Sequence, residues 1–248
     1  MYKFLQIFKR DFLNLLINPM WIFYSTVFPF LLAAIFGFLS SGNYGKEITS
    51  YDYYGISIII YMALNTSTLA ANSFMEEKIK KGNMRIIYSP LPKSNIYISK
   101  ILATALFSCI CHFLVIALLN LTLNVNFGGE NIIYILLILG VFEGFVSILG
   151  VLFCIIFKSE NTANQVLSIV INIFGILGGL FFRLDGFGER MEKLSYISPV
   201  KWLITNIFKV IYDRDFSYYM PTLYILILLS IIALLLCRIF YKEEDYIC

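Results

Sequence analysis

Six apolar stretches, each long enough to cross a lipid bilayer, constrain the fold of this chain more than any other feature. They cover residues 19–39, 52–74, 98–123, 132–157, 163–182 and 218–241. A helix needs about 20 apolar residues to span the roughly 30 Å hydrocarbon core of a bilayer. Of the 248 residues, 59% are hydrophobic and only 14% are charged, against about 25% charged in soluble domains. We therefore predict an all-α integral membrane protein with six transmembrane helices, in which residues 1–248 form a single domain.

A separate amphipathic segment precedes the first span. Residues 2–17 place Phe4, Phe8 and Phe12 on one side at helical spacing, while Lys3 and Arg10 fall on the other. This pattern predicts a helix that lies in the membrane interface. The first span is too long for the apolar region of a signal peptide, so we expect it to be retained.

The loop between the second and third spans is rich in basic residues. Six lie within residues 73–100, against two acids, Glu76 and Glu77; they are Lys78, Lys80, Lys81, Arg85, Lys93 and Lys100. Short basic loops stay on the cytoplasmic side, and six spans then place both termini in the cytosol. The loop has a charged turn, a break at Gly82, an apolar patch and a Ser-Pro-Leu-Pro stop, which predicts a short helix outside the membrane. Such a loop either only fixes orientation or also offers a docking helix to a partner.

Several polar residues occur inside the predicted spans. Asn65, Thr68 and Asn72 fall in the second span and Asn172 in the fifth. Polar groups are costly against lipid, so these side chains are predicted to face other helices or a hydrated pathway.

Two pairs of glycines four residues apart are further candidates for helix packing. Gly140 and Gly144 lie in the fourth span, and Gly175 and Gly179 in the fifth. Small residues at this spacing let helix backbones approach closely. The pattern is also common by chance in apolar segments.

Glu143, near the middle of the fourth span, is the acid most suggestive of chemistry. An ionised carboxylate there costs on the order of 2.5–3.5 kcal/mol. It could relay protons or cations, or it could be a protonated or paired group that holds two helices together. Cys109, Cys111 and His112 offer soft metal ligands, but helical geometry puts the two cysteines on different sides, so we expect ordinary span residues and no metal site.

Other classes of function have little support. The net charge of +3 forms no basic face interleaved with aromatic residues, so nucleic-acid binding is not expected. The five cysteines suggest no disulfide framework. No Ser-His pair, paired aspartates or metal-binding set is visible at membrane depth, so we predict no catalytic residues. The sequence also has no G-x-x-x-x-G-K-[ST] phosphate loop, which argues against ATP hydrolysis by this chain.

The order of residues in two segments resembles the type-2 ABC exporter permeases, which move drugs, peptides, lipids and polysaccharides outward. In the basic loop the matching residues are Glu76, Glu77, Lys78, Gly82, Met84, Ile87, Ser89, Pro90 and Lys100. Near the end of the fifth span they are Gly178, Gly179, Phe181 and Phe182, followed by Ile197, Ser198, Pro199 and Trp202. One departure is Arg183, where many relatives have Pro.

The resemblance implies roles for both segments. Residues 75–97 would form a cytosolic coupling loop whose helix docks on an ATPase, and residues 183–217 would form outer re-entrant helices. The ATPase-coupling residues would be Glu76, Glu77, Lys78, Gly82, Met84, Arg85 and Ile87. The pathway or helix-packing candidates are Asn65, Thr68, Asn72, Glu143, Asn172, Gly175 and Gly179.

The resemblance also implies partners. The chain would be the permease of an exporter in a bacterial cytoplasmic membrane, with two ABC ATPase subunits and a second permease, identical or related. ATP and Mg would be bound by the ATPase, and this chain would hold no cofactor and catalyse no reaction itself. A peptide or drug is the first expectation for the cargo and a polysaccharide or lipid the second. The alternative is a stand-alone secondary carrier or channel that works through Glu143.

Overall fold

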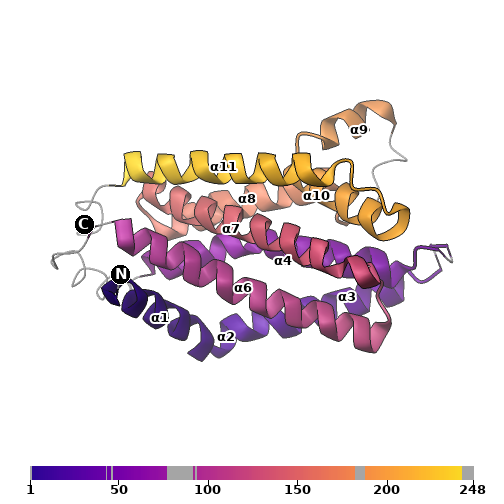
Figure 1. The fold of residues 1–248 in the computed structure, drawn as a ribbon, viewed down its shortest axis with the longest axis horizontal. Coiled ribbons are helices and arrows are strands. Elements are labelled where there is room, and N and C mark those ends of the chain that lie inside the picture. Colours follow the sequence, from indigo (N-terminus) through magenta and orange to yellow (C-terminus); the bar gives the residue numbers. More distant parts are fainter. Residues whose placement is uncertain are drawn as a thin grey trace.

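A computed structural model of the chain describes residues 2–42, 44–45, 47–76, 92, 94–181 and 188–241. These residues form helices and connecting turns, and no strand occurs among them. Six helical segments are long and apolar enough to cross a membrane: Pro19–Leu39, Ser50–Met75, Ser94–Leu123, Gly129–Phe157, Glu160–Gly178 and Tyr219–Phe240. The predicted all-α membrane fold with six spans is confirmed, and Figure 1 shows the spans side by side in one bundle.

The N-terminal part consists of a helix outside the first span and a first span in three pieces. Helix α1 (Tyr2–Ile17) ends at Asn18, whose side chain accepts a hydrogen bond from the Met20 amide and begins α2 (Pro19–Ile22). A π-helical turn, η1 (Phe23–Val27), then leads into α3 (Phe28–Leu39). Helix α1 packs against α6 (Ser94–Leu123) and leaves apolar side chains such as Leu5 and Ile17 exposed, as expected for contact with lipid.

Helix α4 (Ser50–Met75) is the central element, because it packs against α3, α6, α7 (Ile132–Phe157) and α8 (Glu160–Gly178). Its N-terminus is closed by a capping box between Thr49 and Asp52, which satisfies two backbone donors that a helix start leaves free. The Asp52 carboxylate also accepts a hydrogen bond from the Asn126 amide, 2.7 Å away. The loop between α6 and α7 is thereby held against the start of α4.

Helices α4 and α7 approach each other closely at Gly150. A Cβ atom on Gly150 would lie 2.0 Å from the carbonyl oxygen of Ser67. The glycines at positions 140 and 144 have more room: a Cβ on Gly140 would lie 3.8 Å from Cys109 Sγ, and one on Gly144 would have no described heavy atom outside its own helix turn within 4 Å. In the described part of the chain, the backbone contact of α7 with α4 therefore depends on Gly150.

Among the described residues, three short helices lie between α8 and the last span, α11 (Tyr219–Phe240). They are α9 (Glu189–Ser195), α10 (Pro199–Phe208) and the π-helical turn η4 (Lys209–Asp213). Figure 1 places α9 and α10 at the end of the bundle opposite the chain termini. We call this the distal end. A further short turn, η2 (Gly129–Asn131), begins the fourth span there.

The start of α1 and the end of α11 lie at the other end of the bundle, which we call the terminal end (Figure 1). The ring of Tyr241, after α11, lies 5.4 Å from Tyr97 at the start of α6 and 6.4 Å from Phe74 at the end of α4, between ring centroids. Glu76 ends α4 there by donating its amide to the Asn72 carbonyl. The predicted coupling residues Glu77, Lys78, Gly82, Met84, Arg85 and Ile87 lie outside the described residues.

Candidate functional site

Polar side chains follow one side of α4 and one side of α8 along much of the membrane depth. On α4 they recur every three or four residues, which puts them on one helix face. The same spacing holds on α8. We call this surface the polar face; its members are Tyr61, Asn65, Thr68 and Asn72 of α4 and Asn164, Ser168 and Asn172 of α8.

The two helices contact each other across the polar face through side-chain amides and a tyrosine. Asn164 Nδ2 donates to Asn72 Oδ1 at 2.5 Å near the terminal end, and the Tyr61 hydroxyl donates to Asn172 Oδ1 at 3.4 Å further along. The Tyr24 hydroxyl of η1 reaches Asn65 Oδ1, also at 3.4 Å. The predicted candidates Asn65, Asn72 and Asn172 thus each contact a second polar side chain.

The described part of the chain covers the polar face only partly. Its α4 members are half-buried, and Ser168 and Asn172 of α8 are exposed. Several of its groups bond to their own helix, as when Thr68 Oγ1 donates to the Asn65 carbonyl at 2.8 Å. Even so, a strip of amides and hydroxyls at membrane depth is unfavourable against lipid. The arrangement can line a hydrated pathway or meet polar groups of another chain.

The glycines proposed for the fifth span lie at its distal end. Gly179 adopts a left-handed conformation with φ 76° and closes α8, which glycine allows without strain. Its carbonyl accepts a hydrogen bond from the Tyr53 hydroxyl. A Cβ atom on Gly175 would lie 3.6 Å from the Tyr61 ring, next to the polar face.

Glu143 has a partner that the sequence analysis did not identify. His112 Nδ1 on α6 lies 2.8 Å from Glu143 Oε1 on α7. The exposed fractions of the two residues are 2% and 0%, so the contact is shielded from solvent and lipid. His112 also lines a very small cavity with Tyr24, Asn65 and Thr66, which adjoins the polar face.

A second buried pair joins the N-terminal helix to the bundle. Asp11 of α1 accepts hydrogen bonds from Lys100 Nζ at 2.5 Å and from Ser99 Oγ at 2.8 Å. Asp11 and Lys100 are 5% and 2% exposed. Lys100 therefore lies inside α6 and holds α1, although the sequence analysis grouped it with the basic loop. Only its place near Asp11 in three dimensions could have indicated this role.

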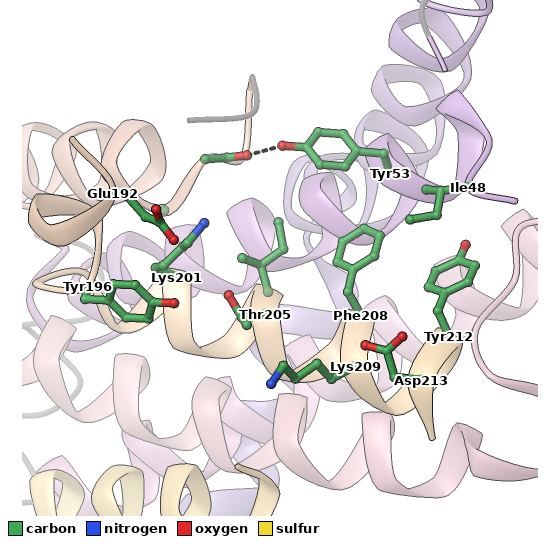
Figure 2. A pocket seen from close by; sticks show the side chains of 13 residues that line it. Ile48, Tyr53, Glu192, Tyr196, Lys201, Thr205, Phe208, Lys209, Tyr212 and Asp213 are labelled. Atoms are coloured by element: carbon green, nitrogen blue, oxygen red, sulfur yellow. Dashed lines mark hydrogen bonds between the residues drawn. The ribbon is translucent and has the colours of Figure 1, made fainter. Parts of the chain in front are cut away.

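The distal end contains an open pocket of about 490 Å³, shown in Figure 2. Residues from α4, α8, α9, α10 and η4 line it. Glu192, Tyr196 and Lys201 lie toward one end of the pocket, and Tyr212 and Asp213 toward the other. These residues fall in the predicted re-entrant segment. Its first residues, 183–187, lie outside the described part of the chain.

Two sets of polar-face residues were missed in the sequence analysis. Tyr61 of α4 and the α8 residues Asn164 and Ser168 were not among the candidates. The signal for α8 was present, because the polar residues Asn161, Gln165, Ser168 and Asn172 recur every three or four positions.

The described residues contain no group of three His, Cys, Asp or Glu side chains placed to hold a metal ion.

Comparison with known proteins identifies the family. A search of curated proteins gave no match. The family model for the ABC-2 type transporter matches residues 2–212, which include α1, the first five spans, α9 and α10. The polar face, both buried pairs and every lining residue of the pocket at the distal end except Asp213 fall within the matched region. The chain therefore belongs to the ABC-2 type transporter family and is the membrane-spanning permease component of an ABC transporter.

Proposed function

We propose that this chain forms half of the translocation pathway of an ATP-driven exporter in a bacterial cytoplasmic membrane. Two permeases, identical or related, would face each other through their polar faces. Two separate ATPase subunits would bind ATP and Mg and dock on the predicted coupling loop. The observation that carries the proposal is the exposed polar face of α4 and α8 at membrane depth, in a chain of this family.

The distribution of basic residues indicates which end of the bundle lies in the cytosol. The basic loop at residues 73–100 connects two spans at the terminal end, and Lys158 and Arg238 also lie near that end. We therefore place the terminal end, with both chain termini, in the cytosol. The distal end also has basic residues, but Glu192, Asp213 and Asp215 offset them. The carboxyl of Asp215 has a pKa below its usual range, mainly because the Ser217 amide and hydroxyl donate to it. This acid therefore adds a negative charge at the distal end.

Helix α4 connects the proposed docking site to the pathway. Glu76 ends α4 at the terminal end, and the same helix carries four members of the polar face. Closure of the ATPase subunits would push on the coupling loop, and a rigid α4 would transmit that movement to the polar face. The spans would have two packings that give different access to the pathway, and nucleotide bound to the ATPase subunits would shift the equilibrium between them.

The cargo is proposed to be an amphipathic molecule such as a peptide or drug. The polar face combines amides with aromatic rings, including Tyr24 and Tyr61, and Tyr61 packs edge-on against Phe181 with ring centroids 5.2 Å apart. Amides can bond to polar groups of a cargo while rings contact its apolar parts.

Cross-linking between copies tests the polar face directly. In a variant without the five native cysteines, Asn172→Cys would place one thiol on the polar face. Leu228→Cys, a 58% exposed position on α11, is the matched control on another surface. We expect a bifunctional thiol reagent to join Asn172→Cys to a second permease in native membranes and to leave Leu228→Cys uncoupled. Labelling of Asn172→Cys from the lipid phase, with no cross-linked product, would refute the proposal.

Purification from native cells tests the ATPase partner. The tagged chain, extracted in mild detergent, should co-purify with an ATPase in a one-to-one ratio. Replacing residues 76–85 with a neutral linker should remove the ATPase while the permease still inserts. A chain that purifies alone and transports in liposomes without ATP would instead establish the secondary-carrier alternative. The pairing of Glu143 with His112 supports a helix-joining role for this acid rather than that alternative.

A further inference from the structure

Two cavities outside the polar face meet at Trp202 on α10. The first, of about 450 Å³, lies at the distal end and is lined by residues that include Thr205, Asn206, Lys209 and Tyr218. The second, of about 460 Å³, continues into the membrane between α8 and α11 and has Phe142, Phe145 and Leu149 of α7 among its lining residues. Trp202 lines both. Because they share this residue, we treat them together as one groove, which we call the Trp202 groove.

The groove changes character along its length. Its deep part is lined almost entirely by apolar side chains from α4, α7, α8 and α11, down to Leu229 and Phe153. Its distal part contains a lysine, a threonine, an asparagine and a tyrosine. From Tyr218 to Leu229, α11 rises about 16 Å at 1.5 Å per residue. This is close to half of the roughly 30 Å hydrocarbon core, and on α7 the lining continues to Phe153, four residues before the end of that helix.

Lys209 supplies the charge at the distal mouth of the groove. Its Nζ lies 4.0 Å above the Tyr218 ring and 3.6 Å from Asp215 Oδ2. Its side chain is 31% exposed, and an ammonium group has three donors. The contacts with Asp215 and Tyr218 hold the ammonium at the mouth of the groove and leave donor capacity for a phosphate.

Part of the Trp202 groove lies on the side of α8 away from the polar face. On α8, the groove is lined by Leu167, Val170, Ile171 and Phe174. At 100° per residue, Val170 and Phe174 lie on the side of the helix opposite Ser168 and Asn172, while Leu167 and Ile171 flank the polar face. A second permease that covers the polar face therefore leaves the part of the groove at Val170 and Phe174 uncovered.

We propose that the Trp202 groove binds a diacyl phospholipid from the leaflet at the distal end, with its phosphate at Lys209 and one acyl chain in the deep apolar part. The polarity and charge of the groove match the two ends of such a lipid. The bound lipid would fill the space between α8 and α11 and stabilise the packing of α10 against them. The proposal does not depend on the direction of transport or on the cargo.

Tryptophan fluorescence in lipid vesicles tests the proposal, because the chain has only two tryptophans, Trp21 and Trp202. The variant Trp21→Phe leaves Trp202 as the reporter, and Trp202→Phe leaves Trp21 as a reporter of ordinary boundary lipid. The probe is phosphatidylglycerol with brominated acyl chains, which quenches a tryptophan in contact with it. We expect quenching of Trp202 to saturate at a small fraction of brominated lipid, and quenching of Trp21 to rise in proportion to that fraction.

Two further variants separate the phosphate from the acyl chain. Lys209→Gln should weaken the response to brominated phosphatidylglycerol several-fold and leave the response to brominated diacylglycerol unchanged. Lys201→Gln, which changes a lysine of the same helical segment that does not line the groove, should have no effect. Val170→Phe should reduce quenching of Trp202 by both lipids, because it fills the deep part. Equal, proportional quenching of both tryptophans, or a Lys209→Gln response to phosphatidylglycerol like that of Lys201→Gln, would overturn the proposal.

Discussion

His112 Nδ1 lies 2.8 Å from Glu143 Oε1, and this contact joins α6 to α7 in the interior of the bundle. The His112 side chain is 3% exposed and that of Glu143 is 0% exposed. A buried polar group without a partner is strongly destabilising. The two residues therefore depend on each other, and the single histidine of the chain acts as the partner of the most deeply buried acid among the described residues.

Replacing either member of this pair alone with leucine should destabilise the protein far more than replacing both. We expect His112→Leu to cost about 3–5 kcal/mol, because it leaves the carboxylate buried and unpaired. Glu143→Gln should be tolerated, since the amide can still bond to Nδ1. The double variant His112→Leu/Glu143→Leu should recover most of the loss. Thermal unfolding of the purified variants, followed by circular dichroism, measures these differences; additive effects of the two single leucine variants would contradict the coupling.

Gly150 should tolerate no larger residue. Because a Cβ there would lie 2.0 Å from the Ser67 carbonyl oxygen, Gly150→Ala must separate α7 from α4. We expect a loss of about 3 kcal/mol or more, at the upper end for overpacked sites. Gly144→Ala is the matched control in the same helix, and it should be neutral or slightly stabilising because alanine favours the helix. Equal melting temperatures for both variants would show that α4 and α7 do not approach at Gly150.

The contact of Asp11 with Lys100 should hold α1 against α6. Asp11→Ala should lower the free energy of unfolding by about 3–5 kcal/mol, since it leaves a lysine buried without its acid. The exchanged pair Asp11→Lys/Lys100→Asp should restore part of this loss. Arg10→Gln, next in sequence but exposed, serves as the control. Limited proteolysis after α1 should be fastest for Asp11→Ala, slower for the exchanged pair and slowest for Arg10→Gln. Rapid cleavage of Arg10→Gln would argue against the assignment.

Changes on the polar face should affect transport more than folding. Asn172→Leu removes an exposed amide and its contact with Tyr61, worth about 1 kcal/mol. We therefore expect a small change in melting temperature, but a several-fold loss of ATP-dependent transport if the face lines the pathway. Ile176→Leu, one helical turn further on α8 and also exposed, should leave both unchanged. Normal transport by Asn172→Leu in liposomes with the ATPase present would count against this role.

The number, order and approximate limits of the spans could be predicted from the sequence, because about 20 consecutive apolar residues satisfy the requirement for crossing a bilayer locally. The two span ends that shifted most, by four residues each, are also local effects. The third span begins at Ser94 rather than at residue 98, and α8 ends at Gly178 because Gly179 turns left-handed. The family was recognisable from the order of residues in two segments.

The sequence alone determined that the chain is a helical membrane protein of six spans and that polar residues occur within the second and fifth. Only the tertiary structure decided which of these residues meet. Asp11 and Lys100 are 89 positions apart, and His112 and Glu143 are 31 apart. Helical periodicity fixes the face on which a side chain lies, but not which helix packs against that face or at what height. That choice depends on close approaches such as Gly150 against Ser67, where backbones of distant segments come into contact.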